Sequence, residues 1–173
     1  MGPVVNADQL KRVDTYTQIG KAEGARVLTG GRVLTENGLD DGYFYAPTVF
    51  SDVDPTMRIA QEEIFGPSIA VIPVDTLEQA IEVANNTSYG LSLAIYTHDV
   101  NHAFRAINDL ESGIVYVNAP TIGAEIQLPF GGIKGTGNGH REAGPTAIEE
   151  FSEIKSVFVD YSGRLQRAQI DNR

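Results

Sequence analysis

The sequence predicts an α/β fold: a three-layer, mainly parallel sheet with helices on both faces, plus a C-terminal edge strand. Three observations predict this class. Apolar and amphipathic segments alternate in the middle of the chain in the order strand, helix, strand, helix, strand. The connections between them are short, which favours parallel pairing through right-handed crossovers. The length of 173 residues fits one domain with a buried core, so residues 1–173 are predicted to form a single domain.

The first part of the chain is predicted to form one helix and two extended segments. Residues 6–23 predict a helix, because Asn6 can cap its start and an apolar stripe follows at helical spacing. The segment "ARVLTGG" predicts a short strand that closes on two glycines. The segment "FYAPTVF" predicts an extended stretch, in which Pro47 marks an edge or a strand end.

The alternation is clearest between residues 67 and 118. Apolar segments predict strands at 67–74, 91–97 and 113–118, and helices are predicted at 75–86 and 99–110. Ligands in open α/β folds bind at the carboxyl ends of the strands. Asn118 and the glycine-rich segment after it are expected at such an end.

The last part of the chain begins with a long segment, residues 119–146, that lacks periodicity. A loop of this length in a compact domain is usually functional or a linker. The segment "TAIEEF" then predicts a short helix, and "IKSVFVDY" alternates strongly enough to predict a terminal strand within about residues 152–161. Residues 162–173 form a polar tail.

Composition excludes several classes of protein. There is no cysteine, which excludes disulfides, thiolate metal sites and a cysteine nucleophile within this chain. The net charge of −10 argues against a nucleic-acid partner. No apolar run approaches the roughly 18 residues of a spanning helix, and the start lacks a signal-peptide pattern. We therefore expect a cytoplasmic protein that binds neither nucleic acid nor membrane.

Two segments could carry chemistry, and each has alternative interpretations. In "EEIFGP", the carboxylates of Glu62 and Glu63 could act as general acid and base, cap a turn, or accept hydrogen bonds from sugar hydroxyls beside an aromatic ring. In "LPFGGIKGTGNGHREAG", the spacing does not fit a P-loop, because Asn138 stands where lysine is needed. This segment is expected to form the wall of a pocket or a flexible loop. Phe130 within it could fill a small core or line a ligand tunnel.

The three histidines do not predict a metal site. His98 and His102 have i,i+4 spacing, but no carboxylate stands near them in metal-binding order. His140 and its neighbours Arg141 and Glu142 are expected to make local ion pairs at the surface.

Taken together, four segments resemble, in order and at the expected spacing, the C-terminal part of the aldehyde dehydrogenase superfamily. They are "EEIFGP", "ANNTSYGLSLAIYTHD", "GIVYVN" and "LPFGGIKGTGNG". The opening "GPVVNADQLKRVDTYTQIGKAEGARVLTGG" resembles the segment before them, so the resemblance covers about residues 2–160. It implies that Glu63 holds the ribose hydroxyls next to the nicotinamide and that Phe65 helps to position the nicotinamide ring. It also implies that Phe130 lies beside the aldehyde passage and that Asn118 is structural.

The resemblance also implies what the chain lacks. Members of this superfamily oxidise an aldehyde to a carboxylic acid with NAD or NADP. Their dinucleotide-binding domain and catalytic cysteine lie upstream of the segment that this chain resembles. We therefore expect no catalytic residue in this chain, weak or no cofactor binding, and no turnover by the chain alone. The competing hypothesis is an interaction module, in which the terminal strand pairs with a second copy or docks onto a separate N-terminal half.

Overall fold

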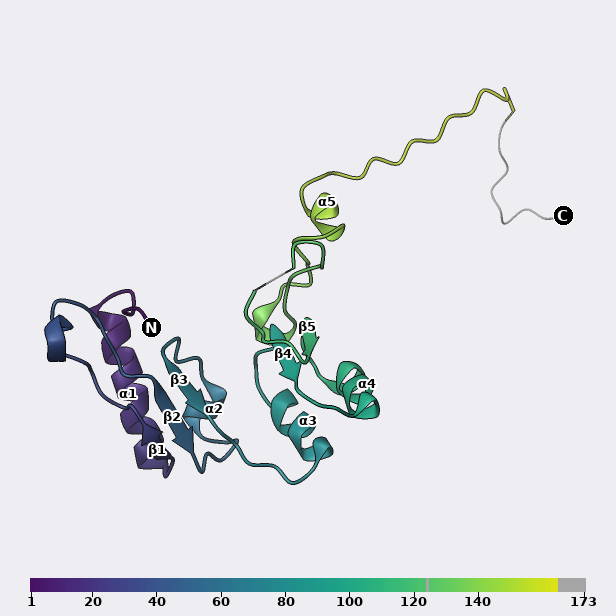
Figure 1. Ribbon diagram of the computed structural model, residues 1–173. Helices are drawn as coiled ribbons and strands as arrows, with labels where there is room; N and C mark the ends of the chain where they lie inside the picture. Colours follow the sequence, from purple (N-terminus) through teal and green to yellow (C-terminus); the bar gives the residue numbers. More distant parts are fainter. Residues whose placement is uncertain (124, 165–173) are drawn as a thin grey trace.

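The computed structural model of the protein describes residues 1–123 and 125–164. Its first element is helix α1 (Ala7–Glu23) (Figure 1). The side-chain oxygen of Asn6 accepts a hydrogen bond from the backbone N–H of Gln9 at 2.9 Å, which caps the helix start. Gly24 ends the helix in the left-handed conformation, with φ 105°. The predicted bounds of this helix are confirmed.

Three short strands form a sheet against α1. They are β1 (Arg26–Thr29), β2 (Thr48–Ser51) and β3 (Ser68–Ala70). The strand order is β1-β2-β3, with β1 antiparallel and β3 parallel to the central β2. The 3-10 helix η1 (Glu36–Gly38) lies between β1 and β2, and the short helix α2 (Arg58–Gln61) lies between β2 and β3.

The core of this half is built from α1, the β1–β2 sheet and α2. Tyr16, Ala25, Phe50, Val53 and Ile59 form one buried cluster, in which Phe50 is fully buried. Burying such apolar side chains is the main favourable term in folding. The first half thus has a core of its own, which holds α1 and the end of α2 together.

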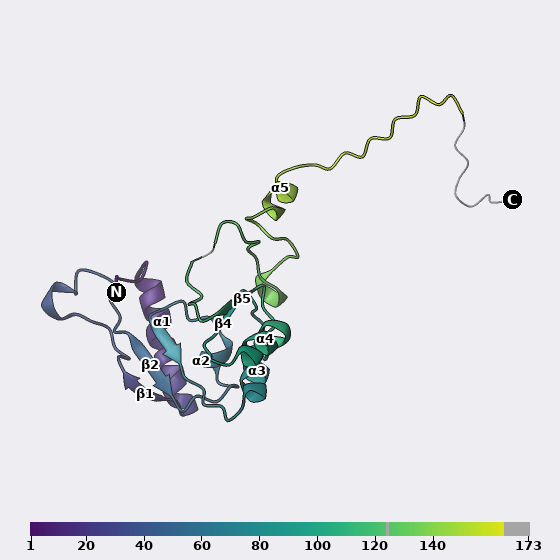
Figure 2. The ribbon, with the colours of Figure 1, turned by 45° about the vertical axis from the view of Figure 1, so that its right-hand side comes forward.

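The second half contains the helix–strand alternation that the sequence predicts. Its elements are α3 (Leu77–Asn85), β4 (Ser92–Ile95), α4 (Val100–Asp109) and β5 (Ile114–Val117). Strands β4 and β5 pair in parallel, with α4 as the connection between them. Helices α3 and α4 lie side by side in both views (Figure 2). Thr76 and Asp99 cap the two helices through their side-chain oxygens.

The remaining described residues contain little regular structure. The glycine-rich segment holds the 3-10 helix η2 (Lys134–Thr136), and α5 (Thr146–Glu150) follows it. Residues 151–164, after α5, run away from the body in both views (Figures 1 and 2). None of the helices in the described part of the chain is long and apolar enough to cross a membrane.

The α/β class with parallel pairing is confirmed, but two details differ from the prediction. The strands form a three-stranded and a two-stranded sheet instead of one continuous three-layer sheet. The edge strand predicted within about residues 152–161 does not form in the single chain, and its pairing with a second chain stays a prediction. A strand needs a partner for its backbone donors and acceptors, and this segment has none in the described part of the chain. Of the predicted polar tail, residues 165–173 lie outside the described residues.

Candidate functional site

Glu62, the first glutamate of the "EEIFGP" segment, is bound by side chains from α1 and α2. The hydroxyl of Tyr16 donates to Glu62 Oε2 at 2.5 Å. Arg58 makes a bidentate contact, from Nε to Oε1 at 2.8 Å and from Nη2 to Oε2 at 2.9 Å. The hydrogen bonds from Arg58 and then Tyr16 lower the pKa of Glu62 to about 2. This carboxylate is therefore an anchor and not a free acid or base.

Glu63, the second glutamate, is exposed and makes no side-chain hydrogen bond or ion pair within residues 1–123 and 125–164. The backbone at Glu62 is extended, with φ −116° and ψ 146°, so neighbouring side chains point to opposite sides. Glu63 lines a hollow of about 320 Å³ together with Gly90, Leu91 and Thr136. Because only Glu63 is free, the two carboxylates do not form an acid–base pair that shares a proton.

Phe130 lines a second hollow, of about 470 Å³, whose wall is the glycine-rich segment. His140, Glu142 and Glu150 contribute polar side chains to it. The two hollows share Leu91 and Thr136 as lining residues, so they adjoin. Phe130 is half-buried, and besides this hollow it lines a small cavity together with Ile114, Tyr116 and Leu128.

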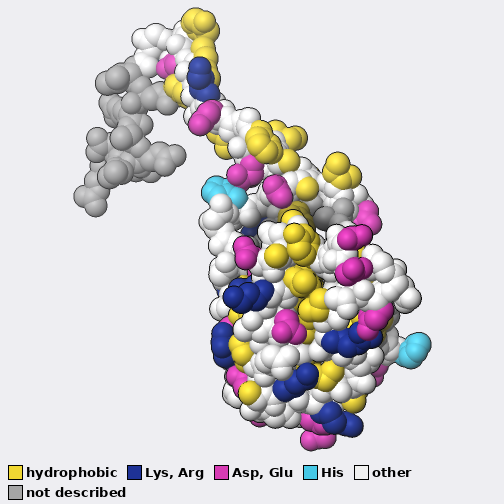
Figure 3. Space-filling model, turned by 90° about the vertical axis from the view of Figure 1, so that its left-hand side faces the viewer, with side chains coloured by type: hydrophobic (Ala, Val, Ile, Leu, Met, Phe, Trp, Pro, Cys, Tyr) yellow, Lys and Arg dark blue, Asp and Glu magenta, His cyan; other side chains and the backbone are white. Residues whose placement is uncertain are grey.

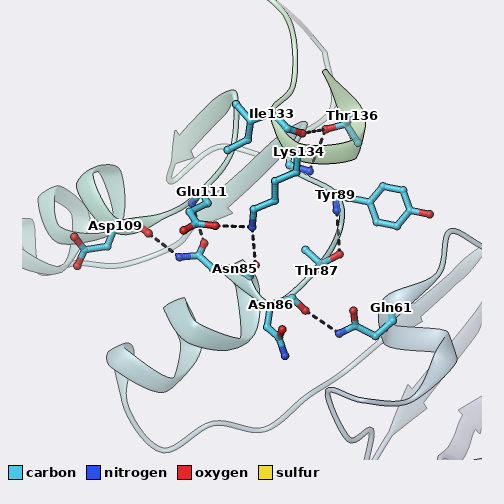
Figure 4. Close-up of polar contacts among 11 residues, drawn as sticks. Gln61, Asn85, Asn86, Thr87, Tyr89, Asp109, Glu111, Ile133, Lys134 and Thr136 are labelled. Atoms are coloured by element: carbon cyan, nitrogen blue, oxygen red, sulfur yellow. Dashed lines mark hydrogen bonds and ion pairs between the residues drawn. The ribbon is translucent and has the colours of Figure 1, made fainter. Parts of the chain in front are cut away.

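The hollows keep their shape because the glycine-rich segment is bound to the chain around Asn85 (Figure 4). Lys134 Nζ donates to the carbonyl oxygen of Asn85 at 2.6 Å and pairs with Glu111 Oε2 at 2.6 Å. The hydroxyl of Thr136 accepts from the N–H of Gly90 at 3.0 Å. These contacts bind residues 134–136 of the glycine-rich segment to the end of α3 and to the residues before β4, which fits the wall interpretation.

The first half of the molecule is joined to this wall through the end of α2. Gln61 Nε2 donates to the carbonyl oxygen of Asn86 at 2.8 Å, directly beside the segment that binds Lys134 (Figure 4). Gln61 also precedes the two glutamates in the sequence. This hydrogen bond therefore links the end of α2 to the end of α3, next to the hollow that Glu63 lines.

Two glycines allow the backbone to approach closely at the wall. A Cβ atom at Gly113 would lie 1.7 Å from the carbonyl oxygen of Gly131, and one at Gly137 would lie 1.9 Å from that of Gly132. No other residue fits at such distances. Gly113, just before β5, and Gly137, in the glycine-rich segment, thus allow close packing of the backbone.

Phe65 does not share a hollow with Glu63. Its ring is 78% exposed and lines a separate hollow with Gly66, Pro67 and the N-terminal residues Met1 to Val4. Its backbone adopts the left-handed conformation, with φ 56°, which is unusual for phenylalanine. The structure therefore brings Glu63 and Phe130 to adjoining hollows and leaves Phe65 on another side of the loop.

Asn118 has contacts that fit the structural role expected for it. Its side-chain oxygen accepts from the N–H of Thr97 at 2.8 Å, and its Nδ2 donates to the carbonyl oxygen of Thr97 at 3.0 Å. These two bonds join the ends of β4 and β5. His140 Nδ1 contacts the carboxylate of Glu150 at the surface. Within the described residues there is no group of three potential metal ligands.

The anchoring of Glu62 predicts a specific response to acid. Its pKa in the folded chain, about 2, lies below the ordinary value of 4.5, so the unfolded chain takes up this proton first as the pH falls. Its stabilisation is therefore complete above about pH 4.5 and is lost towards about pH 2. We expect Glu62→Gln to be less stable than the parent at neutral pH, with a difference that narrows in acid. Urea unfolding at several pH values measures this.

The matched control for this prediction is Glu82→Gln, at an exposed position on α3. The difference in the free energy of unfolding between Glu82→Gln and the parent should stay small and constant across the same pH range. A Glu62→Gln variant whose difference from the parent is equally constant would contradict the anchoring of this carboxylate.

Comparison of this sequence with known protein families identifies the class of protein to which the fold and the site belong. The sequence matches the aldehyde dehydrogenase family over residues 1–157. The chain therefore belongs to the aldehyde dehydrogenase family, a family of oxidoreductases, and the resemblance of its motifs to this superfamily is confirmed.

Individual relatives show how much of such a protein the chain represents. It is 42% identical over 159 residues to the alpha-ketoglutaric semialdehyde dehydrogenase of Bacillus subtilis, covering 92% of this chain and 33% of that protein. It is 41% identical over 160 residues to the betaine aldehyde dehydrogenase of Mesorhizobium japonicum, with 92% and 32% covered. The chain thus spans about a third of the length of these relatives.

Solved structures agree with this assignment. The aldehyde dehydrogenase of Mycobacterium tuberculosis complexed with NAD+ superposes with a TM-score of 0.87 at 41% identity, over 95% of this chain and 33% of that one. The NAD-dependent aldehyde dehydrogenase of Sinorhizobium meliloti gives a TM-score of 0.88 at 34% identity, over 96% and 32%.

Proposed function

We propose that this chain forms one wall of the active site of an NAD(P)-dependent aldehyde dehydrogenase. Glu63 accepts hydrogen bonds from the ribose hydroxyls next to the nicotinamide, and Phe130 lines the passage of the aldehyde. The observation that carries the proposal is the free carboxylate of Glu63, in a hollow that adjoins the hollow of Phe130. An ionised carboxylate is an acceptor suited to a pair of hydroxyl donors.

The residues of this chain fit the cofactor in different ways. Glu63 offers an unpaired acceptor within the described residues, while Glu62 beside it is saturated by Tyr16 and Arg58. Phe65 has an exposed aromatic face of the kind that can pack against a nicotinamide ring, but it lines a different hollow from Glu63, so its role beside the ring rests on the family resemblance. When bound, the nicotinamide accepts the hydride from the substrate. The part of this chain is to bind and orient it.

The reactive thiol must come from polypeptide outside this sequence, because the sequence contains no cysteine. We expect the chain alone to show no oxidation of aldehydes with NAD or NADP above the buffer control. The measurement is the absorbance of the reduced nicotinamide, with the full-length Bacillus subtilis relative as the positive control. Turnover by the chain alone within the ordinary range of enzymes, about 1–10³ s⁻¹, would contradict the proposal.

A second function is supported by the exposed C-terminal segment. Residues 151–161 carry apolar side chains that are 62–96% exposed, namely Phe151, Ile154, Val157, Phe158, Val159 and Tyr161. In Figure 3, hydrophobic side chains extend along the projecting segment and continue in a band over the body. Such a segment can pair with an edge strand of a second copy or of a separate N-terminal half. Light scattering tests this, since a monomer at high concentration would contradict self-association.

A further inference from the structure

The backbone of the segment that carries Glu63 and Phe65 is held by side chains from α1. Gln9 Nε2 donates to the carbonyl oxygen of Ile64 at 2.9 Å and to that of Phe65 at 2.8 Å. Arg12 Nη2 donates to the carbonyl oxygen of Glu63. Three consecutive carbonyl groups are thus bound by two side chains of one helix, more than 50 residues away in the sequence.

This segment has few backbone hydrogen bonds of its own. It connects the end of α2 to the start of β3, and in the described part of the chain no N–H of residues 63–66 donates to a backbone carbonyl. Phe65 also adopts a left-handed backbone conformation, which costs free energy for a residue with a bulky side chain. The donors of α1 therefore supply hydrogen bonds that the segment lacks in its own backbone.

Arg12 is also part of the cluster that anchors Glu62. Its guanidinium lies 4.9 Å from the centre of the Tyr16 ring, and that of Arg58 lies 5.5 Å from it. Tyr16 is 7% exposed and donates its hydroxyl to Glu62. The same cluster thus binds the side chain of Glu62 and the backbone carbonyl of Glu63, while the Glu63 carboxylate has no partner within residues 1–123 and 125–164.

We propose that Gln9 and Arg12 are positioning residues: through the carbonyl groups of residues 63–65, they set the direction in which Glu63 and Phe65 point. The functional meaning of this inference rests on the proposed function of Glu63. The positioning itself is a property of the cofactor-free chain, so it can be tested separately.

The test is ¹⁵N relaxation by NMR on the cofactor-free, full 173-residue chain. The variants are Gln9→Met and Arg12→Met, which keep much of the side-chain volume and remove the donors. The matched controls are Gln18→Met and Lys11→Met, at exposed positions of the same helix. In Gln9→Met, we expect the order parameters of residues 64–66 to fall from about 0.85 to below about 0.6, with those of α1 unchanged. Arg12→Met should loosen the same residues.

A direct signature comes from scalar couplings across the hydrogen bonds, from Gln9 Nε2 to the carbonyl carbons of Ile64 and Phe65. The proposal predicts these couplings in the parent chain and their loss in Gln9→Met. It is overturned if the couplings are absent in the parent, or if Gln9→Met and Arg12→Met have the same order parameters as the controls.

The outcomes for positioning and for the proposed function are distinguishable. If residues 64–66 loosen as expected while Glu63→Gln leaves cofactor use unchanged in an active enzyme, the positioning stands and the cofactor role of Glu63 fails. If these residues stay ordered while Glu63→Gln impairs cofactor use, the positioning proposal fails and the cofactor role stands.

Discussion

Gly113→Ala is expected to destabilise the chain by about 3 kcal/mol, because it forces a side chain into contact with a fixed backbone. The new Cβ atom would lie 1.7 Å from the carbonyl oxygen of Gly131, and the N–H of Gly113 donates to the carbonyl of Gly90 at 2.9 Å. Neither backbone can move without breaking the contacts between β4, β5 and the glycine-rich wall. The midpoint of urea unfolding should fall by about 1–3 M.

The control for this prediction is Gly2→Ala, because a Cβ atom at Gly2 has no atom within 4 Å. This variant should keep the midpoint of the parent. A Gly113→Ala variant with the midpoint of Gly2→Ala would show that the wall does not pack against the start of β5 as described.

Glu63→Gln is expected to have the largest effect on function. The test uses a chimera in which this chain replaces the matching third of the Bacillus subtilis relative, which supplies the remainder of the fold. On the proposed role of Glu63, replacing its carboxylate by an amide removes charge-assisted hydrogen bonds to the ribose. Bonds of this kind contribute about 1.5–3 kcal/mol, so kcat/KM for the cofactor should fall about 10- to 150-fold. The measurement is steady-state kinetics at varied cofactor concentration.

Glu82→Gln in the same chimera is the control, since Glu82 is an exposed residue of α3. Its kcat/KM should equal that of the unsubstituted chimera. Equal values of kcat/KM for the Glu63→Gln and Glu82→Gln chimeras would contradict the assignment of Glu63 to the cofactor site.

The helices were predictable because their start signals are local. Asn6 and Thr76 cap α1 and α3 with hydrogen bonds to residues only three positions away. The parallel pairing of β4 and β5 followed from the short connection through α4. The division into two sheets was not predictable, since pairing depends on which strands are available as neighbours. For the same reason, the alternating pattern of residues 154–161 does not produce a strand in the single chain.

The site was predictable only in part. The sequence motif selected Glu63 by family resemblance, whereas the first glutamate is occupied by Arg58, four residues before it, and by Tyr16, 46 residues away. Gln9, Arg12 and Gln61 gave no signal in the sequence, because their contacts join segments that are distant along the chain. Lys134 was equally hidden, although it fixes the wall beside Phe130.

The most direct test of the central claim is a double-mutant cycle between Glu63 and the ribose next to the nicotinamide. The kinetics of the chimera and of its Glu63→Gln variant are measured with NAD and with an analogue that lacks the hydroxyls of that ribose. If the carboxylate binds those hydroxyls, Glu63→Gln should weaken the use of NAD but have little further effect with the analogue. The free-energy changes of the two modifications are then non-additive, with a coupling of about 1–3 kcal/mol. Purely additive effects would contradict the claim that Glu63 holds the ribose.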